Sequence, residues 1–201
     1  MIDITDARLI GKGSSRLCYE HPGDGGKCIK VVYTKNCSIV SEELKHYRLC
    51  EKRQVSWDMM AKSFGTVLTS AGEGAVFSLP RDFDGEISKT MAHYLHSGLA
   101  APEAEVLGRA VKAFREYLFR ERIIVRELKA DNLVYQRYGR DAGKLVLVDG
   151  LGNNEFLPIA NYSDIFAKRT LSRKWRKFVC HLQRDFSHSP LLQGLLSRVR
   201  S

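Results

Sequence analysis

The chain changes character near residue 84, and this change limits the folds open to it more than any other feature. Before that point, short β-like runs alternate with glycine-rich turns; after it, helical periodicity dominates, with one hairpin. Strands followed by helices are typical of the α+β class. We therefore expect one small domain of two lobes, with an antiparallel sheet over about residues 1–83 and a helical, truncated lobe over about residues 84–201.

The first lobe is predicted to contain two hairpins and one helix. Gly/Asp clusters between apolar runs predict the hairpin turns. Ser41 is a plausible N-cap, so we expect a helix from there to about Arg53. The expected β-like runs are Ala7–Ile10, Leu17–Tyr19, Cys28–Tyr33, Phe64–Thr69 and Ala75–Leu79.

The second lobe is predicted to be helical around one hairpin. Pro102 suits the first position of a helix that runs to about Arg122. The spacing of Leu107, Val111, Phe114 and Leu118 places them on one helix face. Further elements are expected as a helix over Glu86–His96, a β-like run Ile123–Val125, a hairpin of Leu133–Tyr135 with Leu145–Val148, and a helical C-terminal part.

Composition narrows the partners and the compartment. The net charge of +9 and the pI of about 9.4 favour nucleic acid, an anionic membrane surface or phosphorylated small molecules as partners. No apolar run approaches the roughly 20 residues that cross a bilayer. The first residues include Asp3 and Asp6 and lack the apolar centre of a secretory signal, so we expect a cytoplasmic protein without a transmembrane segment.

The five cysteines do not form a recognisable framework. They are odd in number and contain no C-x-x-C pair, which argues against both a disulfide scaffold and a zinc site. We expect reduced and mostly buried thiols. The residues are Cys18, Cys28, Cys37, Cys50 and Cys180.

The strongest chemical signal is the segment Arg126-Glu127-Leu128-Lys129-Ala130-Asp131-Asn132, which lies between two β-like runs. It resembles the catalytic loop H-R-D-L-K-x-x-N of protein kinases. Val125 stands at the His position and Glu127 at the position of the catalytic Asp. The spacing would let Glu127 accept a proton while the amide of Asn132 holds a metal ion. An ordinary polar loop is the alternative.

An acid directly after a strand supplies the second expected metal ligand. Asp149 follows the run Leu145–Val148 and precedes Gly150, where a kinase places its Mg²⁺-binding Asp. Asp-Gly after a strand is otherwise an ordinary turn. Together, Asn132 and Asp149 would give the two oxygen ligands that are usual for Mg²⁺.

Two features of the first lobe fit a triphosphate. Gly11-x-Gly13, between two strands, would let backbone N–H groups approach the phosphates, although Arg16 replaces the third glycine of the usual pattern. Lys30 lies within an apolar strand, which is costly unless that face is wet or the charge is paired. Glu42 or Glu43 could supply the pair, and we favour Glu43.

The whole pattern resembles the bacterial YrbL family, small proteins of the PhoP regulatory network that are grouped with the protein-kinase-like superfamily. The most specific stretches are residues 76–90 and 146–164. The resemblance implies a kinase-like fold, ATP and Mg²⁺ as cofactors, and a link to envelope-stress or low-Mg²⁺ regulation. It implies Lys30 with Glu43 as the ion pair, Glu127 as base, Lys129 as the group that neutralises the transferred phosphate, and Asn132 with Asp149 as metal ligands.

Three functions compete at this point. The first is an ATP:Mg²⁺-dependent phosphotransferase; about fifty residues follow Asp149, too few for peptide-docking helices, so a small-molecule, sugar or lipid-linked acceptor is favoured over a peptide. The second is a pseudokinase that binds nucleotide as a sensor or scaffold. The third is a nucleic-acid-binding regulator. The basic run Lys168–Lys177 would contact an anionic surface, or it is a solvated helix face whose aromatic residues pack on the core.

Overall fold

The computed structural model describes residues 1–34, 38–152 and 164–200. These residues form two compact units: Met1–Trp57 with Ala61–Pro80, and Asp58–Met60 with the described part of Arg81–Ser201. Cys37 and most of the second family-specific stretch, residues 153–163, lie outside the described residues.

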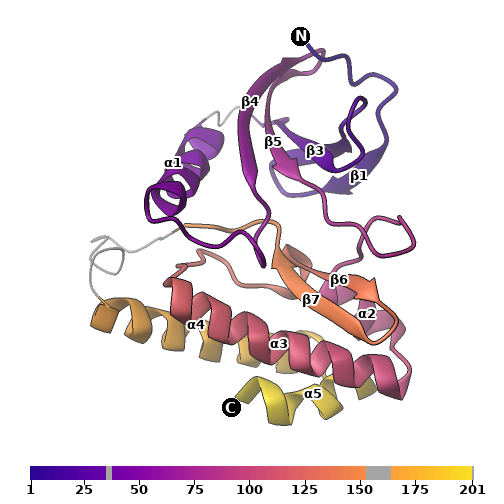
Figure 1. Cartoon of the computed structure of the whole chain (residues 1–201), viewed down its shortest axis with the longest axis vertical. Helices are drawn as coiled ribbons and strands as arrows, with labels where there is room; N and C mark the ends of the chain where they lie inside the picture. The colour runs from indigo at the N-terminus through magenta and orange to yellow at the C-terminus, as the bar shows by residue number, and fades with distance from the viewer. Residues whose placement is uncertain (35–37, 153–163, 201) are drawn as a thin grey trace. The chain divides into compact units, whose positions relative to one another are not determined.

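The first unit is built on a five-stranded antiparallel sheet of order β1-β2-β3-β5-β4. Both predicted hairpins are present, β2 with β3 and β4 with β5, and Figure 1 shows α1 beside β4. The helix begins three residues before the predicted N-cap Ser41. The elements are β1 (Leu9–Lys12), β2 (Arg16–Glu20), β3 (Lys27–Val32), α1 (Ser38–Lys52), β4 (Ser63–Thr69) and β5 (Gly72–Ser78).

The two faces of this sheet differ in chemistry because side chains alternate along each strand. One face carries an apolar core of Ile4, Ile29, Val31 and Val76. Lys30 lies on the other face of β3, and its neighbours in the register are Cys18 on β2 and Ala75 on β5. On β5 this second face carries Ala75 and Phe77, both fully buried, so the predicted site residue Lys30 lies among apolar groups.

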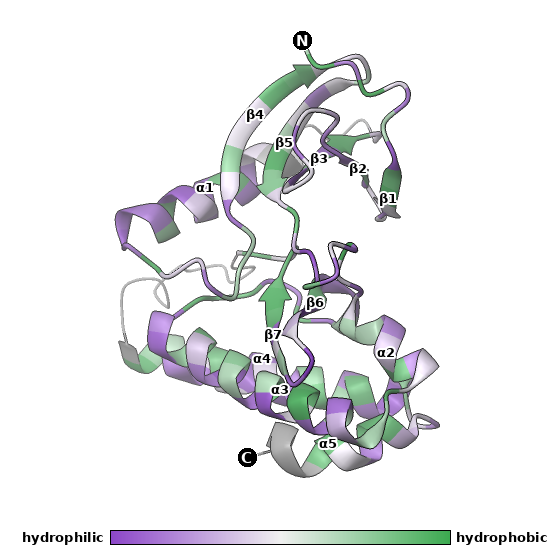
Figure 2. Cartoon of the chain, turned by 45° about the vertical axis from the view of Figure 1, so that its right-hand side comes forward, coloured by the Kyte–Doolittle hydropathy of each residue, from purple (hydrophilic) through white to green (hydrophobic). Residues whose placement is uncertain are grey.

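The second unit consists of four α-helices, one 3₁₀ turn and one hairpin within the described residues. Figure 1 shows α3, α4 and α5 side by side, and Figure 2 shows the apolar end of β7 in green. The elements are α2 (Met91–Ser97), α3 (Ala101–Glu121), η1 (Ala130–Asn132), β6 (Leu133–Gly139), β7 (Ala142–Leu147), α4 (Asp164–Asp185) and α5 (Pro190–Arg200).

The predicted central helix is confirmed with its buried face. Leu107, Val111, Phe114 and Leu118 on α3 are all at most 1% exposed. Pro102 occupies the second rather than the first helical position, because Ala100 is the N-cap. The apolar periodicity therefore identified both the helix and the face that it buries.

Two predictions for the second unit are wrong. The helix expected over Glu86–His96 begins only at Met91, because the Thr90 hydroxyl caps it by accepting a 3.1 Å bond from His93 N and Thr90 itself bridges to Val134. Ile123–Val125 is not a strand. These residues are buried and form only one isolated bridge, from Val125 to Leu151. The class is nevertheless confirmed: a mixed α+β chain with antiparallel sheets and, in the described part, five α-helices.

Candidate functional site

The glycine-rich segment of the first unit is the turn of the β1–β2 hairpin. Gly11 lies in β1 opposite Cys18, and Gly13 N donates a 2.8 Å bond to Arg16 O. Tyr33, directly after β3, fixes the tip, because its hydroxyl donates to the carbonyls of Gly13 at 2.8 Å and Ser14 at 2.9 Å. No pattern in the sequence pointed to this anchoring tyrosine.

Lys30 is buried: its residue is 7% exposed, and its Nζ lies 4.9 Å from the centroid of the Phe77 ring. A cation over an aromatic face gains electrostatic stabilisation that partly offsets the loss of water. The strand alternation therefore places a lysine inside the unit, on the face away from the apolar core.

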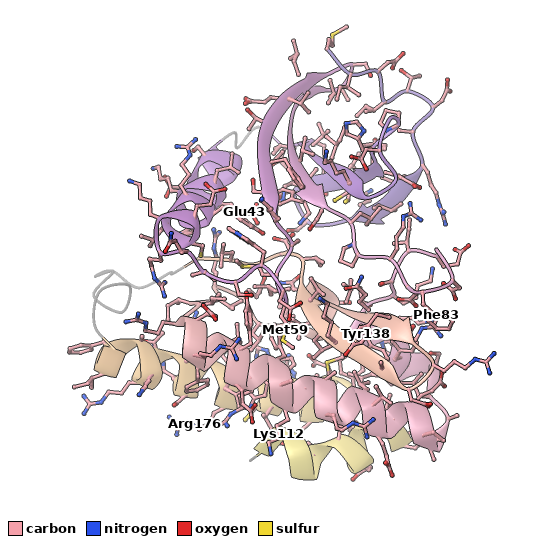
Figure 3. The ribbon with its side chains drawn as sticks, in the orientation of Figure 1. Glu43, Met59, Phe83, Lys112, Tyr138 and Arg176 are labelled. Carbon is pink, nitrogen blue, oxygen red and sulfur yellow. The ribbon has the colours of Figure 1, made fainter. Side chains whose placement is uncertain are left out.

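Glu43 has a partner that the sequence patterns did not predict. It forms a buried ion pair with Arg16, the residue in the third glycine position. Arg16 reaches it because it lies on the same sheet face as Lys30, opposite Val32 in the register. Figure 3 labels Glu43 where it extends from α1 toward the strands. Its Oε1 is buried without a hydrogen-bond partner among the described residues.

The two candidate glutamates differ in exposure. Glu43 is 3% exposed, whereas Glu42 is exposed and pairs with Lys45 on the surface of α1 at 2.5 Å. Glu43 is thus the acid that the helix turns toward the sheet. The pairing of Glu43 with Lys30 stays a prediction. So does the binding of nucleotide by Gly11, Gly13, Lys30 and Glu43.

In the second unit, the Arg126–Asn132 loop is joined to Asp149-Gly150 by backbone hydrogen bonds. Arg126 N donates to Gly150 O at 2.7 Å, and Val148 N donates to Asn132 O at 2.9 Å. The β6–β7 register explains the second bond: because Leu133 pairs with Leu147, the preceding Asn132 meets Val148. The hairpin thereby brings the two predicted metal ligands to one end of the pair of strands.

The Asn132 side chain is oriented within this arrangement. Its Nδ2 donates a 2.9 Å bond to the backbone carbonyl of Glu127. The amide oxygen therefore faces away from that carbonyl. Asp149 is half-buried and accepts a 2.6 Å bond from Gly150 N through Oδ1. Carboxylate and amide oxygens suit a hard divalent cation such as Mg²⁺.

Gly150 allows the close approach of the two segments. Its φ is +82°, a conformation that side chains disfavour. A Cβ there would lie 2.7 Å from Glu127 O and 2.9 Å from Asn132 Nδ2, closer than such atoms pack. The local packing and the positive φ therefore both favour glycine at this position.

Glu127 and Lys129, the predicted base and phosphate-neutralising cation, form an ion pair. Lys129 Nζ lies 2.5 Å from Glu127 Oε1, and the two side chains are about half exposed, at 45% for Lys129 and 56% for Glu127. Solvent screens such a pair, so it contributes little to stability. Both groups are therefore accessible to a ligand, and their catalytic roles stay predictions.

Helix α4 carries the basic run Lys168–Lys177, whose contact with an anionic surface stays a prediction. Trp175 and Phe178 are 4% and 1% exposed, so these aromatic residues pack on the core rather than interleave on a surface. Most of the basic side chains are exposed, as on a solvated helix face. Lys174 differs, because its Nζ donates a 2.8 Å bond to the carbonyl of Arg126. One turn of the helix is thus tied to the candidate site.

Comparison with known proteins gives the family. A family model described as PhoP regulatory network protein YrbL matches residues 2–183. The chain belongs to this family. A protein of Escherichia coli (strain K12) described as uncharacterized protein YrbL is 30% identical over 182 residues, which cover 89% of this chain and 87% of that relative. A Shigella flexneri protein of the same description matches with the same identity and coverage.

The YrbL resemblance expected from the sequence is confirmed by these matches. The description of the family model names a regulatory network and no activity. In the described part of this YrbL-family chain, none of the helices is both long and apolar enough to cross a bilayer. The same residues hold no cluster of three or more His, Cys, Asp or Glu side chains suited to a metal. A site built on Asn132 and Asp149 would depend on phosphate oxygens and water for its remaining ligands.

Proposed function

We propose that this YrbL-family protein is an ATP- and Mg²⁺-dependent phosphotransferase with a small, bilobal protein-kinase-like fold. The transferred group is the γ-phosphoryl of ATP, and the acceptor is the hydroxyl of a small molecule, sugar or protein. The two compact units would correspond to the sheet lobe and the helical lobe. The chemistry requires positioning and charge neutralisation more than covalent participation by the protein.

The observation that carries the proposal is the junction of Glu127, Asn132 and Asp149. Hydrogen bonds of 2.7–2.9 Å hold the loop and the Asp149-Gly150 segment together. The side-chain oxygens of Asn132 and Asp149 and the accessible carboxylate of Glu127 therefore belong to one hydrogen-bonded cluster. The absence of a side chain at Gly150 lets the two segments approach this closely.

Each residue of this junction would have a distinct task. When bound, Mg²⁺ neutralises the developing charge on the phosphates. Asn132 and Asp149 would hold the ion, and the bond from Asn132 Nδ2 to Glu127 O would keep the amide oxygen directed toward it. The Glu127 carboxylate would accept the proton of the acceptor hydroxyl. Lys129, beside it, would neutralise the phosphoryl group in transfer.

The first unit supplies support of another kind. Lys30 is buried on the face of the sheet opposite the Ile29 core, and Tyr33 holds the tip of the β1–β2 turn. A lysine ammonium is a common partner of phosphate oxygens. We assign Lys30 to the α/β-phosphates and the backbone around Gly11 and Gly13 to the phosphate cradle.

A pseudokinase is the second candidate, and one observation favours it. Glu43, the expected partner of Lys30, is engaged by Arg16. In protein kinases the Lys–Glu pair must be in place for activity. In this alternative the protein binds nucleotide as a regulatory or scaffold protein in a bacterial stress regulon, without transferring phosphate.

A thermal melting scan with ATP plus Mg²⁺ tests the nucleotide site. We expect the melting temperature to rise with ATP concentration in the wild type, and Lys30→Met and Asp149→Asn to abolish the rise. The Asp149→Asn substitution keeps an oxygen for the Gly150 N–H while removing the charge. Lys112→Met is the matched control, because Lys112 is an exposed lysine on α3, labelled in Figure 3.

The same preparations are then tested for transfer with γ-labelled ATP. Turnover in the wild type that is lost in both site variants supports the phosphotransferase. Stabilisation without turnover supports the pseudokinase. A wild-type protein whose melting is unaffected by ATP and Mg²⁺ contradicts both.

A further inference from the structure

A pocket of about 270 Å³ lies beside the Arg126–Asn132 loop, entirely within the second unit. It is formed by the loop on one side and by one face of α4 on the other. The residues used below are Arg126, Glu127, Lys174, Lys177, Phe178 and His181.

The α4 residues of this pocket share a helical face by their spacing. Lys174, Phe178 and His181 follow one another at intervals of four and three residues, and Lys177 precedes His181 by one turn. Phe178 is 1% exposed and forms the floor, since it packs into the core. Lys174, Lys177 and His181 line the pocket together with it.

The charge of the pocket is strongly positive. Arg126, Lys174 and Lys177 contribute cations, and His181 adds a further ring N–H donor. Glu127 is the one acid among its described lining residues, and it is already paired with Lys129 at 2.5 Å. A concave site with this excess of donors attracts an anion.

Arg126 has a polar atom that the described residues leave without a hydrogen bond. Its Nε is buried and has no hydrogen-bond partner among the described residues. The backbone of Arg126 is fixed on both sides, because its N–H donates to Gly150 O at 2.7 Å and its carbonyl accepts from Lys174 Nζ at 2.8 Å. Leaving a buried donor without a hydrogen bond is costly in free energy. A guanidinium is well suited to bind phosphate oxygens.

The volume limits the ligand to a small group. At about 270 Å³ the pocket lies just below the range of about 300–1,000 Å³ that is usual for small-molecule sites. The polar group of a metabolite fits these dimensions, with the rest of the molecule extending toward solvent or toward Glu127.

We propose that this pocket binds a phosphate monoester group, and that the acceptor is a small molecule that already carries one. This rests on the proposed phosphotransferase function. The bound phosphate would anchor the acceptor through Arg126, Lys177 and His181, and would set its free hydroxyl against Glu127. In the transfer, the hydroxyl proton moves to the Glu127 carboxylate. The acceptor oxygen forms a bond to the γ-phosphorus of ATP, the bond from that phosphorus to the β-γ bridging oxygen breaks, and ADP leaves.

The anion site is tested first without nucleotide, by calorimetric titration of the full chain with inorganic phosphate at constant ionic strength. Constant ionic strength removes general screening from the comparison. We expect Lys177→Gln with His181→Gln to weaken phosphate binding by about tenfold or more, the loss of at least one charge-assisted hydrogen bond. Arg176→Gln is the matched control, because Arg176 is an exposed cation on the same helix and does not line the pocket (Figure 3). Equal binding by the double variant and the control would overturn the proposal.

The second arm separates an acceptor from a free regulatory phosphate. Sugar phosphates and the matching free sugars are titrated and offered as acceptors with γ-labelled ATP and Mg²⁺. Transfer to a phosphorylated sugar, with no transfer to its free counterpart and loss in the double variant, supports the proposal. Monoesters that bind no tighter than inorganic phosphate and accept no label overturn the acceptor assignment. Phosphate binding in a protein that ATP does not stabilise would leave the anion site standing while the phosphotransferase fails.

Discussion

Arg16 and Glu43 form an ion pair inside the first unit, with side chains that are only 10% and 4% exposed. Arg16 begins strand β2 and Glu43 lies on α1, so the pair connects the sheet to its helix. The partners are 27 residues apart in sequence, and the second carboxylate oxygen of Glu43 has no hydrogen-bond partner in the described part of the chain. The pair is therefore tightly enclosed and only partly satisfied.

Breaking this pair from one side is expected to destabilise the first unit. Arg16→Met leaves a buried carboxylate without its counter-charge, and we expect a loss of about 3 kcal/mol in the free energy of unfolding. Urea denaturation followed by circular dichroism measures it. Arg16→Met with Glu43→Leu should recover most of the loss, because the isolated charge is gone. A single variant that unfolds like the wild type would contradict the pair's role.

Local signals predicted those parts of the fold that local forces determine. The prediction that Leu107, Val111, Phe114 and Leu118 form the buried face of α3 was correct. Apolar residues that recur with the helical period over several turns are compatible with only one buried face. The start of α2 was missed because Thr90 caps the helix and also bridges to Val134, a residue far along the chain. Ile123–Val125 has strand composition but is a buried connection, since burial rather than pairing satisfies its side chains.

The candidate site divides in the same way. The approach of Asn132 to Val148-Asp149 follows from the hairpin register, which alternation in the sequence largely determines. The pairing of Arg16 with Glu43 depends on how α1 lies over the sheet, which no local pattern encodes. The only sequence feature that indicates the pocket beside Arg126 is the spacing of basic residues on one face of α4. That spacing does not predict a pocket unless the position of the Arg126–Asn132 loop opposite the helix is also known.

Gly150 is expected to tolerate no side chain. In Gly150→Ala the new methyl would lie 2.7 Å from Glu127 O, so we expect a loss of about 1–3 kcal/mol in the free energy of unfolding, together with loss of the ATP–Mg²⁺ stabilisation. Gly85→Ala is the matched control: its φ is +85° and nothing lies within 4 Å of the added Cβ. The difference in the free energy of unfolding between the two variants separates the cost of steric crowding from the cost of backbone strain. Equal effects in both would show that the junction can open.

A substitution at Glu127 distinguishes an effect on phosphate transfer from an effect on nucleotide binding. If it is the general base, Glu127→Gln lowers the rate of transfer by about 100-fold or more while the ATP–Mg²⁺ melting shift is unchanged. Asp131→Asn, at an exposed acid of the same loop, should change neither quantity. A wild type without turnover, together with a gain of turnover in Glu127→Asp, would instead identify the protein as a pseudokinase.

Buried thiols make the stability of the protein depend on alkaline pH. Burial raises the pKa of Cys50 from 9.0 to about 11. The pKa of Cys28 is also raised, by its hydrogen bond with Cys18 and by burial. A thiol whose pKa is raised by folding holds its proton more firmly in the folded chain than in the unfolded one. For Cys50, this contribution to stability is therefore complete below about pH 9 and is lost as the pH rises through about 11.

We expect Cys50 alone to remove about 2 kcal/mol from the free energy of unfolding between about pH 8 and about pH 10.5. Cys50→Ala lowers stability at every pH because it leaves a cavity, but the wild type loses more stability than this variant as the pH rises. Urea denaturation at a series of pH values under reducing conditions gives the two slopes. Cys180→Ala, which removes an exposed thiol, should retain the wild-type slope. Parallel pH profiles for the wild type and Cys50→Ala would mean that the Cys50 thiolate is solvated in the folded state, against the 5% exposure that the structure gives it.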